Sequence, residues 1–159
     1  MFINRILNIK QLVSKKSHFL FGPRGTGKSS LLKHDLGNQA LIIDLLHSET
    51  YMKLMNNASQ LESMIELDKK PFVVIDEIQR VPELLNEVHR LIENKQIRFL
   101  LTGSSARKLK HQGVNLLAGR ARQAELYPLT YHELSNFNLS RYLQFGGLPM
   151  IALSEEPAE

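Results

Sequence analysis

Two glycines, a lysine and a hydroxyl residue occur at a fixed spacing in residues 22–29, Gly-Pro-Arg-Gly-Thr-Gly-Lys-Ser. Gly25 and Gly27 tolerate the backbone angles that turn successive N–H groups inward, toward phosphate oxygens. Lys28 would reach the outer phosphates as a point charge, and the Ser29 hydroxyl would bind the magnesium ion that accompanies a nucleotide. The spacing therefore predicts a site for ATP or GTP with Mg²⁺.

This loop lies between an apolar run and a helical pattern, which is the context that phosphate binding requires. The helix after the loop would direct its N-terminal amides and its dipole at the same anion. A plain Gly-rich surface turn is the alternative. The residues expected to bind the nucleotide are Gly22, Pro23, Arg24, Gly25, Thr26, Gly27, Lys28, Ser29 and Ser30. Among them Arg24 is expected to point toward solvent, because the motif places no requirement on it.

An acidic pair follows the apolar run 72–75 directly. In open parallel sheets the ligand lies beyond the carboxyl ends of the strands, so polar residues at this position are candidates for the site. Asp76 would hold magnesium opposite Ser29. Glu77 would polarise the water that attacks the terminal phosphate, which is the role of a general base. The alternative is that the pair only ends a strand, as acidic residues often do.

Two hydroxyl residues and one arginine complete the candidate site. Thr102 and Ser104 follow the next apolar run, where either could sense the γ-phosphate, although a helix N-cap accounts for one of them equally well. Arg120 lies in a predicted loop, and a loop arginine can stabilise developing phosphate charge, usually in the site of a neighbouring subunit. A solvated surface arginine is the alternative, and Arg122 is the weaker rival for the same role.

Composition argues against disulfide-stabilised proteins, thiolate metal proteins and membrane-spanning proteins. The chain has 159 residues, 43% of them apolar, with 20 Lys and Arg against 16 Asp and Glu and no cysteine, which is typical of a soluble domain without disulfides or thiolate metal sites. Its six histidines show no metal-ligand spacing. Because the first residues lack the core of a signal peptide and no run approaches about 20 apolar residues, we expect a cytoplasmic protein without membrane contact.

Strand and helix patterns alternate along the chain, which predicts a doubly wound α/β domain with a parallel sheet. Mainly apolar runs predict strands over 18–21, 41–45, 72–75 and 97–101. A last candidate strand, over 123–126, follows a poorly patterned stretch. Helical spacing predicts helices over 2–14, from the phosphate loop to Leu36, over 48–55, from a Ser59 capping box to Leu67, and from Pro82 to about Asn94. Gly37 and Asn38 would supply a left-handed stop for the second of these helices.

Three segments together give the chain a family resemblance: Phe21 to Ser29, Val73 to Leu85 with its Asp-Glu-Ile-Gln-Arg-Val-Pro run, and Leu100 to Ser105 with Thr-Gly-Ser-Ser. The chain resembles the AAA-type ATPase domain of prokaryotic proteins that pair this domain with a DUF4143 C-terminal region. The likeness continues through Leu117 to Ala121, Leu126 to Leu134 and Gly146 to Pro149.

The resemblance implies a P-loop NTPase three-layer sandwich of the AAA/ASCE type, whose five-stranded sheet has the order 5-1-4-3-2. It also implies a Walker A motif at 22–29, a Walker B motif at 72–77, a sensor-1 position at Thr102 or Ser104, and an arginine finger at Arg120. Residues 1–127 would form the ATPase core. Residues 128–159 would be the start of a missing or truncated lid or second domain, because relatives continue where this sequence stops.

Three functions are compatible with these observations. The first is Mg²⁺-dependent ATP hydrolysis, slow in isolation, with Lys28 and Arg120 offsetting charge on the transferred phosphoryl group. The second is a nucleotide-gated module that recruits a protein or DNA partner through an absent C-terminal domain. A small-molecule kinase fits less well, because an adjacent Asp-Glu pair favours water as the acceptor. A homo-oligomer would be needed if Arg120 acts on a neighbour.

Overall fold

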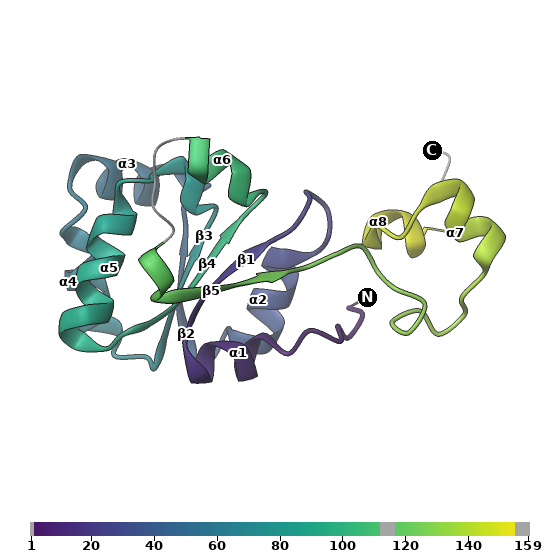
Figure 1. The fold of residues 1–159 in the computed structure, drawn as a ribbon, viewed down its shortest axis with the longest axis horizontal. Helices are drawn as coiled ribbons and strands as arrows, with labels where there is room; N and C mark the ends of the chain where they lie inside the picture. The colour runs from purple at the N-terminus through teal and green to yellow at the C-terminus, as the bar shows by residue number, and fades with distance from the viewer. Residues whose placement is uncertain (1, 112–116, 155–159) are drawn as a thin grey trace.

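The computed structural model of the chain describes residues 2–111 and 117–154 (Figure 1). Five strands form one sheet in the order β2-β3-β4-β1-β5, and every neighbouring pair is parallel. Read from the other edge this order is 5-1-4-3-2, so the predicted α/β class and strand order are confirmed. The strands are β1 (Ser17–Phe21), β2 (Ala40–Asp44), β3 (Phe72–Asp76), β4 (Arg98–Gly103) and β5 (Ala121–Glu125).

Helices connect the strands and cover both faces of the sheet (Figure 1). The α-helices are α1 (Ile9–Lys15), α2 (Lys28–Leu36), α3 (Ser48–Asn56), α4 (Gln60–Asp68), α5 (Leu84–Lys95), α6 (Ala106–His111), α7 (Leu139–Phe145) and α8 (Pro149–Ala152). Two short 3₁₀ helices, η1 (Ile78–Arg80) and η2 (Leu117–Gly119), follow β3 and precede β5.

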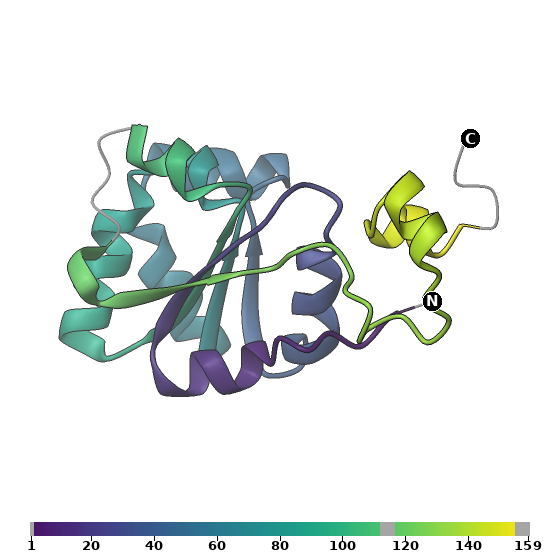
Figure 2. The ribbon, with the colours of Figure 1, turned by 45° about the vertical axis from the view of Figure 1, so that its right-hand side comes forward.

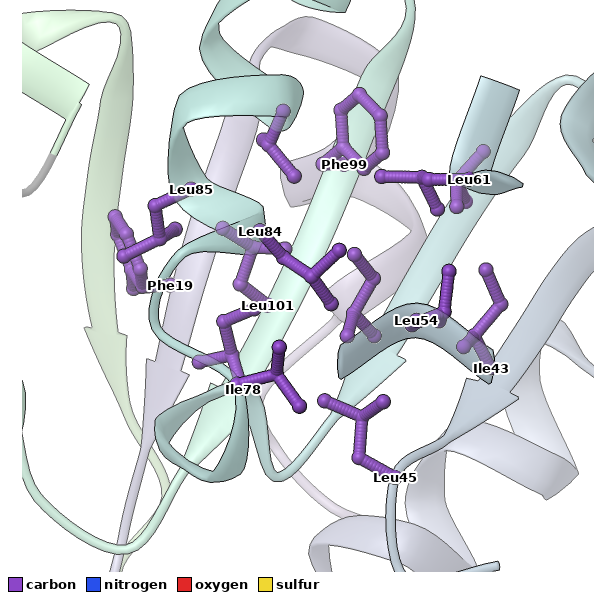
Figure 3. Packing of buried hydrophobic residues seen from close by; sticks show 14 of the residues in the cluster. Phe19, Ile43, Leu45, Leu54, Leu61, Ile78, Leu84, Leu85, Phe99 and Leu101 are labelled. Carbon is purple, nitrogen blue, oxygen red and sulfur yellow. The ribbon is translucent and has the colours of Figure 1, made fainter. Parts of the chain in front are cut away.

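Side-chain alternation along the strands divides the core into two layers. Phe19 and Phe21 of β1 point to one face, where they pack with side chains of α3, α4 and α5, and part of this layer is shown in Figure 3. Leu20 points to the other face and packs with α1 and α2. Both β1 and β3 are buried along their whole length, which agrees with their mainly apolar sequences, Ser-His-Phe-Leu-Phe and Phe-Val-Val-Ile-Asp.

The helix predicted over 2–14 begins only at Ile9, so its first half is wrong. The Asn8 side chain accepts a hydrogen bond from the Gln11 N–H and caps the helix there. Before that cap the chain is irregular, and the Ile6 N–H donates to Glu133, which is distant in sequence. This tertiary contact outweighs the helical spacing of the apolar residues.

Two predicted capping devices are also wrong, although the helix ends near them are right. Gly37 has right-handed backbone angles and continues the turn, with its N–H bonded to the Lys33 carbonyl. Ser59 makes no side-chain bond to the start of α4, because its hydroxyl donates to Asn57 instead.

Beyond β5 the chain leaves the sheet and forms a small unit with α7 and α8, which lies beside α2 and the N-terminal segment in Figures 1 and 2. Leu129 fixes this unit internally: its N–H donates to the Gly147 carbonyl, and its own carbonyl accepts the Tyr142 hydroxyl. Neither helix was predicted, nor was α6. Within the described residues, none of the helices has the length and apolar character needed to cross a bilayer.

Candidate functional site

The loop 22–29 joins the carboxyl end of β1 to the start of α2, as predicted. Gly25 and Gly27 have φ angles of 80° and 89°, the left-handed region that glycine tolerates best. The Thr26 hydroxyl donates to the Pro23 carbonyl at 2.9 Å and closes the loop on itself. Gly22 is needed for a different reason, because a Cβ there would lie 2.3 Å from the carbonyl oxygen of Leu126.

Lys28 is buried at the base of this loop. Its ammonium donates to the carbonyls of Gly22 and Pro23 at 2.7 and 3.1 Å. Burial lowers the pKa of Lys28, and the nearby carboxylates of Glu77 and Asp76 oppose that shift. The loop therefore carries a positive charge that is already placed, and partly desolvated, before any anion binds.

Asp76 connects three elements at the carboxyl edge of the sheet. It is the last residue of β3 and is 3% exposed. Its Oδ2 accepts the Ser29 hydroxyl of α2 at 2.7 Å, and its Oδ1 accepts the Thr102 hydroxyl of β4. The sequence predicted the nearness of Asp76 to Ser29, but it did not predict that Thr102 would orient the carboxylate.

The donor set fits a magnesium ion. Adjacent oxygen ligands of octahedral Mg²⁺ lie about 2.9 Å apart, close to the Ser29–Asp76 separation of 2.7 Å. Across the parts of the chain that the structure describes, no three His, Asp or Glu side chains are grouped as a metal site. A magnesium ion here would thus take its other ligands from phosphate and water, as this ion commonly does.

Glu77 has an unusual backbone conformation. Its φ of 62° and ψ of 46° lie in the left-handed region, which costs a non-glycine residue free energy. Its N–H donates to the Thr102 hydroxyl at 3.1 Å, and its carboxylate accepts the side-chain amide of Gln79. This turn directs the Glu77 side chain toward the cavity beside the phosphate loop.

That cavity has a volume of about 810 Å³ and lies at the carboxyl ends of the strands. Its lining residues are Arg24, Gly25, Gly27, Lys28, Ser29, Ser30, Leu46, Glu77, Gln79, Arg80, Ser104, Pro149 and Met150. Ser104 therefore faces the cavity, whereas Thr102 is fully buried behind it. The exposed Arg24 lies at this cavity as well.

Several lining residues come from places that sequence reasoning did not assign to the site. Leu46 follows β2, Gln79 and Arg80 belong to η1, and Pro149 and Met150 belong to α8. Gln79 and Arg80 lie in the Asp-Glu-Ile-Gln-Arg-Val-Pro run and Pro149 in the Gly-Gly-Leu-Pro run, both of which carried the family resemblance. That resemblance was the available signal for these three residues. A Cβ on Gly27 would lie 3.7 Å from the Pro149 ring, so the start of α8 lies close to the phosphate loop.

Arg5 was also missed, although it touches the loop. Its guanidinium donates to the carbonyls of Thr26 at 2.7 Å and Tyr127 at 2.6 Å, and to Glu133 Oε1 at 2.9 Å. The Arg5 and Glu133 side chains are only 5% and 4% exposed. Since local spacing favoured a helix across Arg5, no signal in the sequence indicated this contact.

Arg120 does not reach the cavity. It precedes β5, whose first residue is level with Ser17 at the amino end of β1. Its guanidinium pairs with Glu93 and lines a second cavity of about 520 Å³, together with Lys15, Lys16 and Arg98. Arg122, one step along β5 beside His18, is likewise near the amino end of the sheet. Any role for Arg120 in catalysis would have to be in another subunit.

The comparisons with known proteins agree with this geometry. A family model described as an AAA domain matches residues 14–135. An uncharacterised protein of Haemophilus influenzae (strain ATCC 51907 / DSM 11121 / KW20 / Rd) is 29% identical over 108 residues, which cover 60% of this chain and 27% of that protein. The chain thus spans well under two thirds of this relative. It belongs to the AAA domain family, whose members are nucleotide-binding P-loop proteins.

Proposed function

We propose that this domain binds ATP with Mg²⁺ and hydrolyses it with water. The observation that carries the proposal is that Lys28, Ser29 and Glu77 line one cavity, while the buried Asp76 accepts the Ser29 hydroxyl at its edge. A fixed cation, a hydroxyl-carboxylate pair suited to Mg²⁺ and a separate carboxylate are the parts that phosphoryl transfer to water requires.

Each side chain has a defined role in this proposal. The backbone N–H groups of the loop and the Lys28 ammonium bind the β- and γ-phosphates, and Ser29 and Asp76 would hold the magnesium ion, which offsets phosphate charge. Glu77 accepts a proton from water as the water oxygen bonds to the γ-phosphorus. The bond from that phosphorus to the ADP oxygen breaks, and the proton then passes to the released phosphate.

The test compares wild type with Glu77→Gln for phosphate release at saturating ATP and Mg²⁺. We expect the variant to bind ATP with unchanged affinity and to lose phosphate release by about 100-fold or more, because the amide cannot accept the proton. Glu49→Gln, an exposed acid outside the cavity lining, is the matched control. Equal rates of phosphate release by wild type and Glu77→Gln would contradict the proposed role of Glu77 as the general base for hydrolysis.

The assay must be sensitive to slow turnover. P-loop NTPases without an arginine from outside can hydrolyse at rates on the order of 10⁻⁴ per second. Arg120 is remote from the cavity, so we expect slow turnover of that kind in the monomer. Product analysis belongs to the same experiment, since phosphate on any acceptor other than water would favour a kinase.

A second candidate, a nucleotide-gated binding module, is favoured by one contact. Arg5 joins the Thr26 carbonyl of the phosphate loop to Glu133 and Tyr127 in the C-terminal segment. A change in loop shape on binding nucleotide would pass directly to residues 127–154, which could present a surface to a protein or DNA partner. ATP-dependent recruitment that survives in Glu77→Gln would favour this candidate over hydrolysis.

A further inference from the structure

Gln79 holds the carboxylate of Glu77 from two residues away. It lies in η1, and its side-chain Nε2 donates to Glu77 Oε2. Glu77 has a left-handed backbone conformation between β3 and η1, and the two side chains meet at this turn. Gln79 also lines the nucleotide cavity, so the contact occurs at the candidate site itself.

The other end of the same amide is unsatisfied. Gln79 Oε1 is buried and has no hydrogen-bond partner within the described part of the chain. A buried acceptor without a donor destabilises the fold. Within the described residues, the hydrogen bond of the Gln79 amide is therefore made by its nitrogen, to Glu77.

Gly103 makes room for this arrangement. It is the last residue of β4, and a Cβ at this position would lie 2.8 Å from Gln79 Oε1. Gly103 has no positive φ that would demand glycine, so the space for the amide is a sufficient reason for its identity. Two residues from different elements therefore shape one contact with Glu77.

From this geometry we propose that Gln79 is a positioning residue that aims the Glu77 carboxylate at the water attacking the γ-phosphate. The inference rests on the proposed hydrolysis. A glutamate side chain has three rotatable bonds, and misplacing a catalytic group by about 1 Å can cost about 100-fold in rate. A neutral amide suits this task, because it fixes the carboxylate without neutralising the charge that accepts the proton.

The first test replaces the amide by an apolar side chain of similar length. We expect Gln79→Met to lower kcat by about 10- to 100-fold with KM for ATP unchanged. The melting temperature should stay the same or rise, since the unsatisfied acceptor is removed. Gln11→Met, in an exposed position of α1, is the matched control and should change neither quantity.

A second variant disturbs the Gln79–Glu77 contact without changing either residue. Gly103→Ala leaves every polar group in place but pushes on Gln79 Oε1, so kcat should fall as in Gln79→Met. In Gln79→Glu, the new carboxylate repels the Glu77 carboxylate instead of donating to it, so kcat should also fall.

The outcomes separate this inference from the proposed function. If wild type releases no more phosphate than Glu77→Gln, hydrolysis fails and the role of Gln79 fails with it. If Glu77→Gln is inactive while Gln79→Met matches wild type in kcat, the role of Gln79 alone is overturned. A raised KM with unchanged kcat would also overturn it, because Gln79 would then bind nucleotide and not position Glu77.

Discussion

Lys28 shows how a residue is prepared for an anion before the anion is present. Its ammonium is held by two carbonyls of its own loop, and burial lowers its pKa. Phosphate oxygens entering the loop would supply the negative charge that the buried ammonium lacks. Because Lys28 is already desolvated in the free protein, phosphate binding need not supply that desolvation free energy again. We therefore expect Lys28 to contribute strongly to the affinity for nucleotide.

We accordingly predict that Lys28→Ala abolishes nucleotide binding, measured by calorimetry with ATP and Mg²⁺. Lys33→Ala, exposed and further along α2, should bind like wild type and is the control. Wild-type affinity should also fall as the pH rises through the lowered pKa of Lys28, because the neutral amine no longer attracts phosphate. Retained affinity in Lys28→Ala would contradict the phosphate-loop interpretation as a whole.

At the residue scale, sequence reasoning found the groups whose chemistry depends on type and spacing. Lys28, Ser29, Asp76 and Glu77 fall into this class, and the structure brings all four to one end of the sheet. It could not find Gln79, whose contact depends on a left-handed turn at Glu77. A glutamate in that conformation is rare, so local propensity does not predict the contact, although Gln79 lies in the run that carried the family resemblance.

At the element scale, the strands and their order followed from the apolar runs and the family resemblance, but the N-terminal segment did not. Phe2, Ile6, Ile9 and Val13 have helical spacing, yet only the last two lie in α1. Arg5 accounts for the difference, because its three hydrogen bonds need an irregular backbone beside the loop. Partners about 130 residues away cannot be read from local spacing.

The Arg5–Glu133 pair connects the N-terminal segment, the phosphate loop and the C-terminal unit, so breaking it should destabilise the contacts among all three. Removing one member of a buried ion pair leaves the other uncompensated, at a cost of about 3 kcal/mol. We expect Arg5→Ala to lose about that much free energy of unfolding in urea denaturation and to weaken ATP binding. Arg90→Ala, which breaks exposed ion pairs with Glu62 and Glu87, is the control and should leave the free energy of unfolding close to that of wild type.

The Arg5–Glu133 pair should also make the free energy of unfolding depend on pH. Burial raises the pKa of Glu133, but hydrogen bonds from the Thr130 N–H, Arg5 and the Ile6 N–H outweigh burial and lower it below 4.5. Its stabilising contribution is therefore complete above about pH 4.5 and is lost as the pH falls through the lowered pKa. Glu133→Gln should make stability less dependent on pH in this acid range, and an unchanged acid-unfolding curve would contradict the role of the pair.

At the scale of the whole molecule, the two ends of the sheet carry different chemistry. The nucleotide cavity lies at the carboxyl ends, whereas Arg120 lies at the amino end of β5. The four residue steps along β1 from Ser17 to Phe21 separate these levels by about 13 Å. An arginine at one end can serve a site at the other only in a head-to-tail assembly, in which each subunit completes the site of the next.

Subunit mixing tests whether Arg120 acts in this way. Arg120→Ala keeps an intact Glu77, and Glu77→Gln keeps an intact Arg120, so each variant alone should be slow. In an equal mixture about a quarter of the interfaces would join a working Glu77 to a working Arg120, and activity should rise to about a quarter of the wild-type rate. Arg122→Ala, on the exposed part of β5, should remain as active as wild type without mixing. Activity equal to the mean of the two variants at every ratio would show that Arg120 serves no neighbouring site, and its pairing with Glu93 would then be a surface contact within one subunit.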